Sequence, residues 1–537
     1  MPRKFNVTGT CFADEHYIAD VSDKLAKIRK MVDDGDYFVI NRPRQYGKTT
    51  TLHFLEQILQ KTGEYIVFSI SFEGLGDEIF HSEKLFSSVF VELLAQQAES
   101  NAPEWTESLI QAAPAADSLN KLSQTITRIL KKTSKKVVIL IDEVDKSTDN
   151  QLFVSFLAML RNKYLNRKKM KTFHSVVLAS VHDVKSLKLK LHPGSDLSGN
   201  NPHQEQKYNS PWNIAAEFTI DMNLDPHEIK PMLDDYVLEN GVKMDTAKIA
   251  QDLFHYTSGY PFLVSKLCKI LDEKILPTKA SKDWTEEDVA DAVRLLLREQ
   301  SNTNFDSLIK TLENNPDLYR LVFSVIIEGN TTVFNPDTPL ISLGLLHGIF
   351  AESEQGTLVI HNRIYRERIA NMMISKWDEM TLIHPERQSN PHGFKDPFLL
   401  PNNCLSLELI LLKFQEFMRS EYSRKDRDFL ERNGRLVFLA FIKPIINGSG
   451  YDFKDPQISE ECRLDVIITF YHHRYLVELK IWRGKIAHEK GLSQLANYLN
   501  RLAMTEGYLI VFDHAEQKSW QSGWINHLGK RIFVVWV

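Results

Sequence analysis

Short apolar runs alternate with amphipathic stretches over the first 220 residues of the chain. The runs are rich in β-branched and aromatic residues, whereas apolar residues between them return with the period of a helix. Strands that alternate with helices are typical of a parallel sheet covered by helices. The pattern therefore predicts an α/β fold, with strands at Tyr37–Asn41, Tyr65–Ser71, Val137–Ile141, Ser175–Ser180 and Glu217–Ile220.

One polar segment interrupts this region, and helices follow it. Lys185–Asn213 is rich in Pro, Gly and Asn, which predicts a long surface loop before the last strand. Further along, the spacing of Thr285 and Asp288 resembles a capping box that opens a helix. Asp317–Met373 predicts helix, a strand at Thr357–Ile360 and helix again, which is the size of a winged-helix module.

A second α/β unit is expected at the C-terminal end. Residues 382–403 contain several Pro, Asn and His residues with little periodicity, so the main linker is expected there. Beyond the linker the pattern predicts a helix at Leu405–Phe417 and strands near Leu436–Phe441, Asp465–Phe470 and Tyr475–Leu479.

Composition and charge exclude several classes of protein. The chain has 537 residues, a formal charge of −5 and 43% hydrophobic residues, so several globular domains are expected. It lacks the roughly 20 consecutive apolar residues of a membrane span and the apolar segment of a secretory signal, which predicts a cytoplasmic protein without membrane contact. The near-neutral balance excludes a histone-like attraction to nucleic acid but allows a local basic groove. The cysteines are too far apart for a metal knuckle and are expected to be buried or incidental thiols: Cys11, Cys268, Cys404 and Cys462.

The first candidate site follows the strand Tyr37–Asn41. This strand leads through RPRQYGKTT into an amphipathic helix, which is the context of a phosphate-binding P-loop. Lys48 offers a point charge for the β and γ phosphates, and Thr49 offers a hydroxyl for Mg²⁺. Arg42 stands where the GxxxxGK[ST] pattern has its first glycine, so the match is incomplete. The predicted nucleotide-binding set also includes Arg44, Gly47 and Thr50.

A second motif, VVILIDEVD, fits the first. Its apolar strand ends in Asp142 and Glu143. A carboxylate at the tip of a buried parallel strand beside a P-loop can hold Mg²⁺, and the next acid can polarise the attacking water. The two motifs together predict ATP as the ligand, with Mg²⁺ held by Thr49 and Asp142 and with Glu143 as the catalytic residue. Two alternatives stay open, namely that Glu143 serves only as a switch and that the acids merely cap a buried strand.

These motifs carry a resemblance to a known family. Together with Ser210–Asn213, SGYPFLVSKL and the GLL…NRIYRE stretch, Gly344–Glu367, they resemble the bacterial AAA-ATPase-like proteins of the STAND-related P-loop class over about Thr8–Ile374. The resemblance implies an ATPase core, a helical lid and a winged-helix-like module that reads the nucleotide state. It also implies that an arginine at position 42 is usual and that Ser180 acts as a nucleotide sensor. A serine that only bonds the backbone at the strand end would look the same.

The C-terminal unit holds a second constellation of charged residues. Asp465 opens one predicted strand and, after twelve intervening residues, Glu478 and Lys480 end the next. Adjacent strands would bring them to one edge of the sheet, where two carboxylates can bind Mg²⁺ and the lysine can orient the nucleophile or stabilise the charge of the transition state. Gln494 and Tyr498 lie four residues apart on the next helix, where both can touch a nucleic-acid backbone or position the metal-bound water. The alternative is that these are ordinary solvated charges at strand ends.

The D-x12-ExK pattern followed by QxxxY resembles the PD-(D/E)XK nuclease superfamily over about Cys404–Val537, with Leu464 in place of the usual proline. This resemblance implies a restriction-endonuclease-like α/β domain. It also implies a further acid from the opening helix, either Glu408 or Glu416. The two resemblances divide the chain into an ATPase core at 1–222, a helical lid at 223–283, a winged-helix-like module at 284–380, a linker at 381–403 and a nuclease-like domain at 404–537.

Two classes of function fit these motifs. In the first, the nucleotide state of the ATPase controls a Mg²⁺-dependent nuclease that acts on nucleic acid, with DNA preferred and with defence against foreign DNA as the setting. In the second, the chain is a nucleotide-driven switch or scaffold whose C-terminal fold binds nucleic acid or protein without cleaving. The retained Asp465, Glu478 and Lys480 favour the first. We also expect a homo-oligomer, because many P-loop ATPases take an arginine from a neighbour. The sequence does not identify that arginine; Arg161 is one candidate, and the alternative is that it is a plain surface charge.

Overall fold

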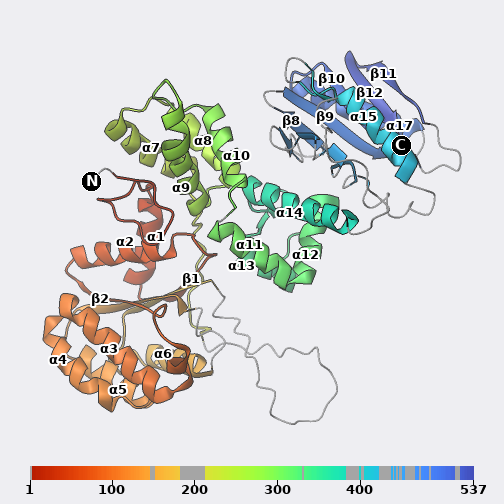
Figure 1. The fold of residues 1–537 in the computed structure, drawn as a ribbon. Coiled ribbons are helices and arrows are strands. Elements are labelled where there is room, and N and C mark those ends of the chain that lie inside the picture. The colour runs from red at the N-terminus through yellow and green to blue at the C-terminus, as the bar shows by residue number, and fades with distance from the viewer. Residues whose placement is uncertain are drawn as a thin grey trace, which may run out of the picture. The chain divides into compact units, whose positions relative to one another are not determined.

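The chain divides into two compact units, coloured along the sequence in Figure 1. One consists of Met1–Asn315, Asn335–Ala351 and His361–Tyr365, and the other of Pro316–Phe334, Glu352–Ile360 and Arg366–Val537. The computed structural model describes residues 3–144, 151–181, 212–300, 302–328, 332–382, 398–400, 404–421, 434, 437–439, 441–442, 445–446, 450–453, 466–470, 473–482, 485–513 and 520–537. Most of the predicted loop at Lys185–Asn213, most of the predicted linker at 381–403, and Cys462 and Asp465 lie outside these residues.

A four-stranded parallel sheet forms the centre of the first unit. Its order is β1 (Tyr37–Asn41), β4 (Ser175–Ser180), β3 (Lys136–Asp142) and β2 (Tyr65–Ser71). The predicted strands at these four places are confirmed. Because all four run in the same direction, their carboxyl ends meet at one edge, where Asn41 pairs with Ser180 and Ser71 with Asp142.

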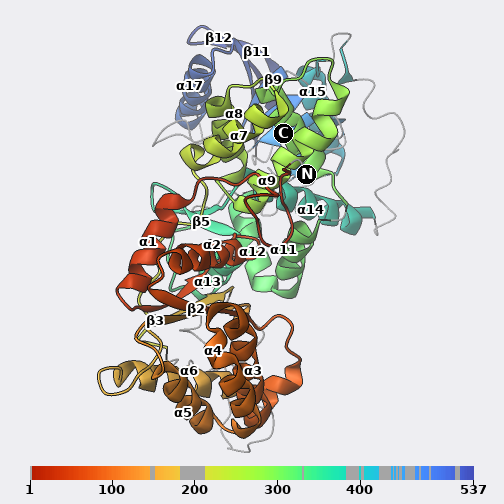
Figure 2. The ribbon, with the colours of Figure 1, turned by 90° about the vertical axis from the view of Figure 1, so that its left-hand side faces the viewer.

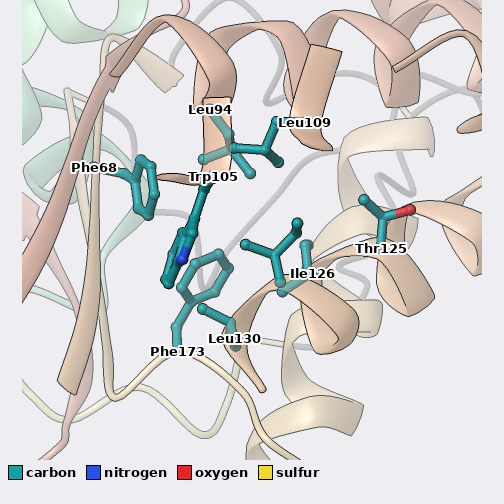
Figure 3. A pocket seen from close by; sticks show the side chains of 9 residues that line it. Phe68, Leu94, Trp105, Leu109, Thr125, Ile126, Leu130 and Phe173 are labelled. Carbon is teal, nitrogen blue, oxygen red and sulfur yellow. The ribbon is translucent and has the colours of Figure 1, made fainter. Parts of the chain in front are cut away.

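Helices cover both faces of this sheet. Figures 1 and 2 show α1 (Ser22–Asp33) and α2 (Lys48–Lys61) on one face, and on the other α3 (Glu83–Asn101), α4 (Pro103–Ala112), α5 (Leu119–Leu130) and α6 (Gln151–Leu165), with the short turns η1 (Asp77–His81) and η2 (Ala113–Ala115) among them. The side chains between this second group and the sheet are apolar and include the fully buried Trp105. Figure 3 shows Trp105 beside Phe68 and Phe173 at a small apolar pocket.

A helical segment follows the sheet within the same unit. It contains α7 (Pro226–Asn240), α8 (Thr246–Thr257), α9 (Pro261–Ile270), η5 (Leu271–Ile275), η6 (Leu276–Thr278) and α10 (Glu286–Leu297). The predicted capping box is confirmed, because the Thr285 hydroxyl accepts from the Asp288 N–H while the Asp288 carboxylate accepts from the Thr285 N–H. The N-terminal segment is fastened to α7, where the Arg3 guanidinium bonds the carboxylates of Asp235 and Glu239 at 2.9 and 2.7 Å.

The middle of the chain consists mostly of helices. It contains α11 (Thr303–Asn314), α12 (Pro316–Phe323), η7 (Ser324–Glu328), α13 (Pro339–Leu346), β5 (Phe350–Glu352), β6 (Leu358–Ile360) and α14 (Arg363–Leu382). The strand predicted at Thr357–Ile360 is therefore confirmed and begins one residue later. Among the helices described, none is long and apolar enough to span a membrane. Of the cysteines that the structure describes, Cys11, Cys268 and Cys404 form no disulfide bond.

A six-stranded mixed sheet lies in the C-terminal part of the second unit. Its order is β11 (Ser522–His527), β12 (Lys530–Trp536), β10 (Glu506–Phe512), β9 (His473–Ile481), β8 (Val466–Phe470) and β7 (Gly450–Phe453). The three central strands β12, β10 and β9 are parallel, and the outer strands pair antiparallel. The helices α15 (Leu407–Glu421) and α17 (Lys485–Arg501) pack on this sheet.

The strand predicted at Glu217–Ile220 is wrong. Ala216 forms a single parallel bridge with Phe38 of β1. Beyond it, the Ile220 carbonyl accepts a hydrogen bond from the Arg42 guanidinium at 2.6 Å, and the Phe218 ring stacks on Phe38 with 6.0 Å between centroids. Side-chain contacts thus hold the segment beside β1 in place of a ladder of backbone bonds.

The strand predicted near Leu436–Phe441 is also wrong, because the described residues there are helical. A short apolar run fits a buried strand or a buried helix equally well. Here the buried positions continue at helical spacing through Phe438, Ile442 and Ile445. Phe414 of α15 packs on this helical segment, with ring centroids 5.1 Å from Phe438 and 5.3 Å from Phe441.

Candidate functional site

Residues 42–47 form a tight loop between β1 and α2. Gly47 precedes the helix with φ +74, and Gln45 has φ +58. Both angles lie in the left-handed region, which glycine adopts at no cost and other residues adopt with strain. The glycine of the GKT sequence is therefore required by the turn, although a Cβ there would meet no atom within 4 Å.

Lys48 is the first residue of α2, and its ammonium lies against the backbone of the loop. Its Nζ donates to the carbonyls of Arg42 and Pro43, both at 2.9 Å, and the side chain is only 6% exposed. The first N–H groups of a helix have no acceptors within the helix and attract anions. Loop, lysine and helix end together provide the donors that a phosphate group needs.

The two sequence motifs meet at the carboxyl edge of the sheet. The Thr49 hydroxyl donates to the Asp142 carboxylate at 2.6 Å, across 93 positions of sequence. The other Asp142 oxygen accepts from the Glu143 N–H at 2.9 Å, and Glu143 has φ +54. The hydroxyl and the carboxylate predicted to hold Mg²⁺ therefore lie in direct contact, and the next acid occupies a strained backbone position.

Arg42 and Ser180 lie beside the loop. The Arg42 guanidinium donates to the carbonyls of Asn41 and Ile220 and lies 5.1 Å from the centre of the Phe218 ring, and burial lowers its pKa. It therefore supports the segment beside β1. Ser180 is fully buried at the end of β4, and its carbonyl accepts from the Arg42 N–H at 3.2 Å.

The remaining predicted P-loop residues contact other segments of the unit. The Thr50 hydroxyl accepts from the Cys11 N–H at 3.1 Å, so the N-terminal segment passes over the start of α2. Arg44 is exposed, and its carbonyl accepts from the Tyr260 hydroxyl at 2.6 Å. Tyr260 lies within the SGYPFLVSKL stretch that carries the resemblance, so sequence reasoning pointed to this segment but not to this residue. His361 lies within the Gly344–Glu367 stretch that carries the resemblance, whereas no pattern in the sequence marks Asn223 or Asn304; all three side chains contact the loop.

In the C-terminal sheet, Glu478 and Lys480 form an ion pair on β9. The Lys480 ammonium lies 2.7 Å from a Glu478 carboxylate oxygen, with side chains 36% and 0% exposed. Alternate residues of a strand face the same side, so Leu476, which packs in the core beneath α17, shares that face with both. Tyr498 of α17 is buried in the same core, and Gln494 lies one turn before it.

The two acids of α15 lie apart from this pair. The Glu408 carboxylate accepts from the Trp524 indole at 2.9 Å, whereas Glu416 pairs with Lys413 at 2.6 Å. Glu478 shares a lateral row with Leu509, Val534 and Gly523, and Trp524 belongs to the next row. Paired residues face the same side and successive residues alternate, so Glu408 contacts the face opposite to Glu478. Among the described residues, no group of three or more His, Cys, Asp or Glu side chains could hold a metal ion.

The match to a known protein family agrees with the first site. Residues 16–189 match the family described as AAA-ATPase-like, predicted AAA-ATPase. No curated protein matches the chain. Similar solved structures include a Walker-type ATPase of Pyrococcus abyssi (10% identity, TM-score 0.46, 68% of this chain and 99% of that one) and the Aeropyrum pernix ORC2 protein in ADPNP-ADP complexes (12%, 0.38, 70% and 97%). Another is the Thermotoga maritima RuvB Holliday junction branch migration motor (16%, 0.32, 72% and 100%). The family match, the parallel sheet and the P-loop geometry support an AAA-like ATPase in the N-terminal part of the chain.

Proposed function

We propose that the first unit binds and hydrolyses ATP at the edge where α2 follows β1. The observation that carries this proposal is the contact of 2.6 Å between the Thr49 hydroxyl and the Asp142 carboxylate, next to the ammonium of Lys48. Lys48 and the N-terminus of α2 bind the phosphates, whereas Glu143 orients and polarises the attacking water. Arg44, Gly47, Thr50 and Ser180 line the nucleotide site.

Magnesium fits the donors at this edge. A hydroxyl and a carboxylate are the hard oxygen ligands that Mg²⁺ prefers, and both belong to residues fixed by regular elements. When bound, the ion neutralises charge on the phosphates. Thr49 and Asp142 are the residues that would hold it, and their mutual hydrogen bond keeps the hydroxyl and carboxylate oxygens next to each other.

We further propose that the C-terminal domain is a Mg²⁺-dependent nuclease of the PD-(D/E)XK type. The buried Glu478, its ion pair with Lys480 and the position of α17 over the same face support this proposal. β8 begins at Val466, which pairs with Val477 directly before Glu478, so Asp465 precedes the strand that neighbours the pair. Asp465 and Glu478 are the proposed metal ligands, and Gln494 and Tyr498 complete the site.

The complete proposal is a nucleotide-controlled nuclease that acts on nucleic acid, with DNA preferred. The proposed domains are those expected from the sequence: 1–222, 223–283, 284–380 and 404–537, joined by the linker 381–403. The proposed setting is conditional cleavage of foreign DNA by a cytoplasmic homo-oligomer.

The test measures both activities in the full chain. ATP hydrolysis with Mg²⁺ is expected to be lost in Lys48→Ala and in Glu143→Gln, while Glu143→Gln still binds ATP. Cleavage of plasmid, single-stranded DNA and RNA is then compared with and without ATP, with Asp465→Ala as the inactive control. If the wild type hydrolyses ATP but cuts nothing under any nucleotide condition, the nuclease proposal fails and the switch or scaffold replaces it.

A further inference from the structure

Three consecutive P-loop residues are bonded to side chains from distant segments of the same compact unit. The Arg44 carbonyl accepts from the Tyr260 hydroxyl at 2.6 Å, and the Gln45 side-chain carbonyl accepts from the Asn304 amide at 2.8 Å. The Tyr46 hydroxyl lies 2.6 Å from Asn223 Oδ1 and 2.7 Å from His361 Nε2. We call the four partners, Asn223, Tyr260, Asn304 and His361, the P-loop clamp.

Tyr46 is the centre of this arrangement. It is 4% exposed, and its ring meets that of Tyr260 edge-on with 4.4 Å between centroids. Asn223 Nδ2 donates to the Asp221 carboxylate at 3.0 Å, which turns Oδ1 toward the tyrosine. Tyr46 therefore donates to Asn223 and accepts from the His361 Nε2–H. The donors and acceptors along this series of hydrogen bonds, from His361 through Tyr46 and Asn223 to Asp221, are therefore mutually consistent.

The imidazole of His361 is held in the matching form. Burial lowers the pKa of His361 to about 4, so the ring is neutral at neutral pH. With the proton on Nε2, Nδ1 is an acceptor, and the Asn362 amide approaches it at 3.3 Å. A neutral histidine with a single tautomer donates one directed hydrogen bond to the loop.

The partner of Gln45 is fixed in the same way. Asn304 is 6% exposed, and its Oδ1 accepts from the buried Tyr365 hydroxyl at 2.8 Å. This bond orients the amide so that its N–H faces Gln45. Gln45 has φ +58, which costs free energy for a residue other than glycine. The hydrogen bond from Asn304 offsets part of that free-energy cost.

We infer that the P-loop clamp positions the loop for nucleotide binding, so that Tyr46 and His361 act as positioning residues although neither belongs to the GKT motif. The loop lacks the first glycine of the usual P-loop pattern, and its Gln45 has a strained backbone. Hydrogen bonds from residues outside the loop therefore help to hold its conformation. A loop that is ordered before the nucleotide arrives binds it more tightly, because less conformational freedom is lost on binding. The inference rests on the proposed ATP site.

The experiment titrates MgATP into the full chain and measures its dissociation constant. His361→Leu removes one buried hydrogen bond and is expected to weaken binding about tenfold. Tyr46→Phe removes that bond and the one to Asn223, so it should weaken binding at least as much. Because the bond between Tyr46 and His361 is lost in both variants, the double variant should be little weaker than Tyr46→Phe alone. His361→Gln keeps an amide N–H near the place of Nε2 and should restore most of the affinity.

A matched control separates positioning from general stability. Tyr236→Phe removes another buried tyrosine hydroxyl, which bonds the Asp272 carboxylate in the helical segment. It should lower the melting temperature and leave the affinity for MgATP unchanged. Tyr260→Phe removes the bond to the Arg44 carbonyl and tests the same clamp if Tyr46→Phe fails to fold.

The outcomes distinguish the inference from the function on which it rests. If the wild type binds MgATP, Lys48→Ala does not, and the folded variants of Tyr46 and His361 bind as the wild type does, the inference is wrong and the ATP site stands. Additive losses in the double variant overturn it as well, because the two residues then act independently. If the wild type itself does not bind MgATP, the proposed function fails, and the inference with it.

Discussion

Lys163 on α6 should destabilise the ATPase core at neutral pH. It is 1% exposed, and its ammonium donates to the Thr127 hydroxyl of α5 at 2.6 Å. Burial lowers its pKa from 10.5 to about 8. The gap between these values corresponds to about 3 kcal/mol of unfavourable free energy for the charged form. Replacing Lys163 also removes its hydrogen bond to Thr127, which reduces the expected gain in stability by about 1 kcal/mol. Lys163→Met should therefore raise the free energy of unfolding by about 2 kcal/mol at pH 7.

The same residue predicts a pH dependence. The unfolded chain keeps this proton up to about pH 10.5, whereas the folded chain releases it at about 8. Between these values the unfolded state binds more protons, so the contribution of Lys163 to the free energy of unfolding rises with pH. Below pH 8 it is constant. In Lys163→Met this rise should be absent. The difference in the free energy of unfolding between the wild type and the variant at each pH cancels the effect of the other titrating groups.

Urea denaturation at pH 7, 8 and 9.5 measures both effects. Lys168→Met, which removes an exposed lysine beyond the end of the same helix, is the control and should leave the curves unchanged. A variant Lys163→Met that is less stable than the wild type at pH 7 would refute the reasoning. Equal pH dependence in the two proteins would refute it as well.

Three further substitutions test the packing. Gly259→Ala should lower the free energy of unfolding by more than about 2 kcal/mol, because φ is +74 and the new Cβ would lie 2.1 Å from the Leu224 carbonyl oxygen; an unchanged melting temperature would contradict this. Thr285→Ala removes the hydroxyl that accepts from the Asp288 N–H and should cost about 1 kcal/mol in urea denaturation, whereas no loss would show that the cap is dispensable. Trp105→Ala should cost about 3–5 kcal/mol in the same assay, and a loss below 1 kcal/mol would mean that the core closes around the gap.

The first sheet could be predicted from the sequence because its strands are buried on both faces. Such strands appear as continuous apolar runs, and the four correct predictions, such as Ser175–Ser180, are of this kind. The meeting of Thr49 and Asp142 also followed from the sequence, since the carboxyl ends of parallel strands share one edge. Local chemistry was equally readable, as in the capping box of Thr285.

The errors arose where tertiary contacts decided between two local structures. The run at 436–441 is as apolar as a strand, yet packing against Phe414 accompanies a helix there. At 217–220 the Arg42 guanidinium takes the Ile220 carbonyl that a strand would have used in its ladder. Arg42, which stands in place of the first glycine of the loop, thus contacts the segment where the fifth strand was predicted.

The P-loop clamp lay beyond prediction for a related reason. The two partners of the Tyr46 hydroxyl are 177 and 315 positions away, and Asn304 is 259 positions from Gln45. No local pattern marks such pairs, because each residue taken alone looks like an ordinary polar surface position. Gly348 gives the same lesson for backbone: it has φ +68, and a Cβ there would lie 3.1 Å from the Pro43 ring. A glycine is needed at position 348 because the P-loop passes close to it. The conformation of the P-loop in turn depends on clamp residues that lie outside the GKT motif.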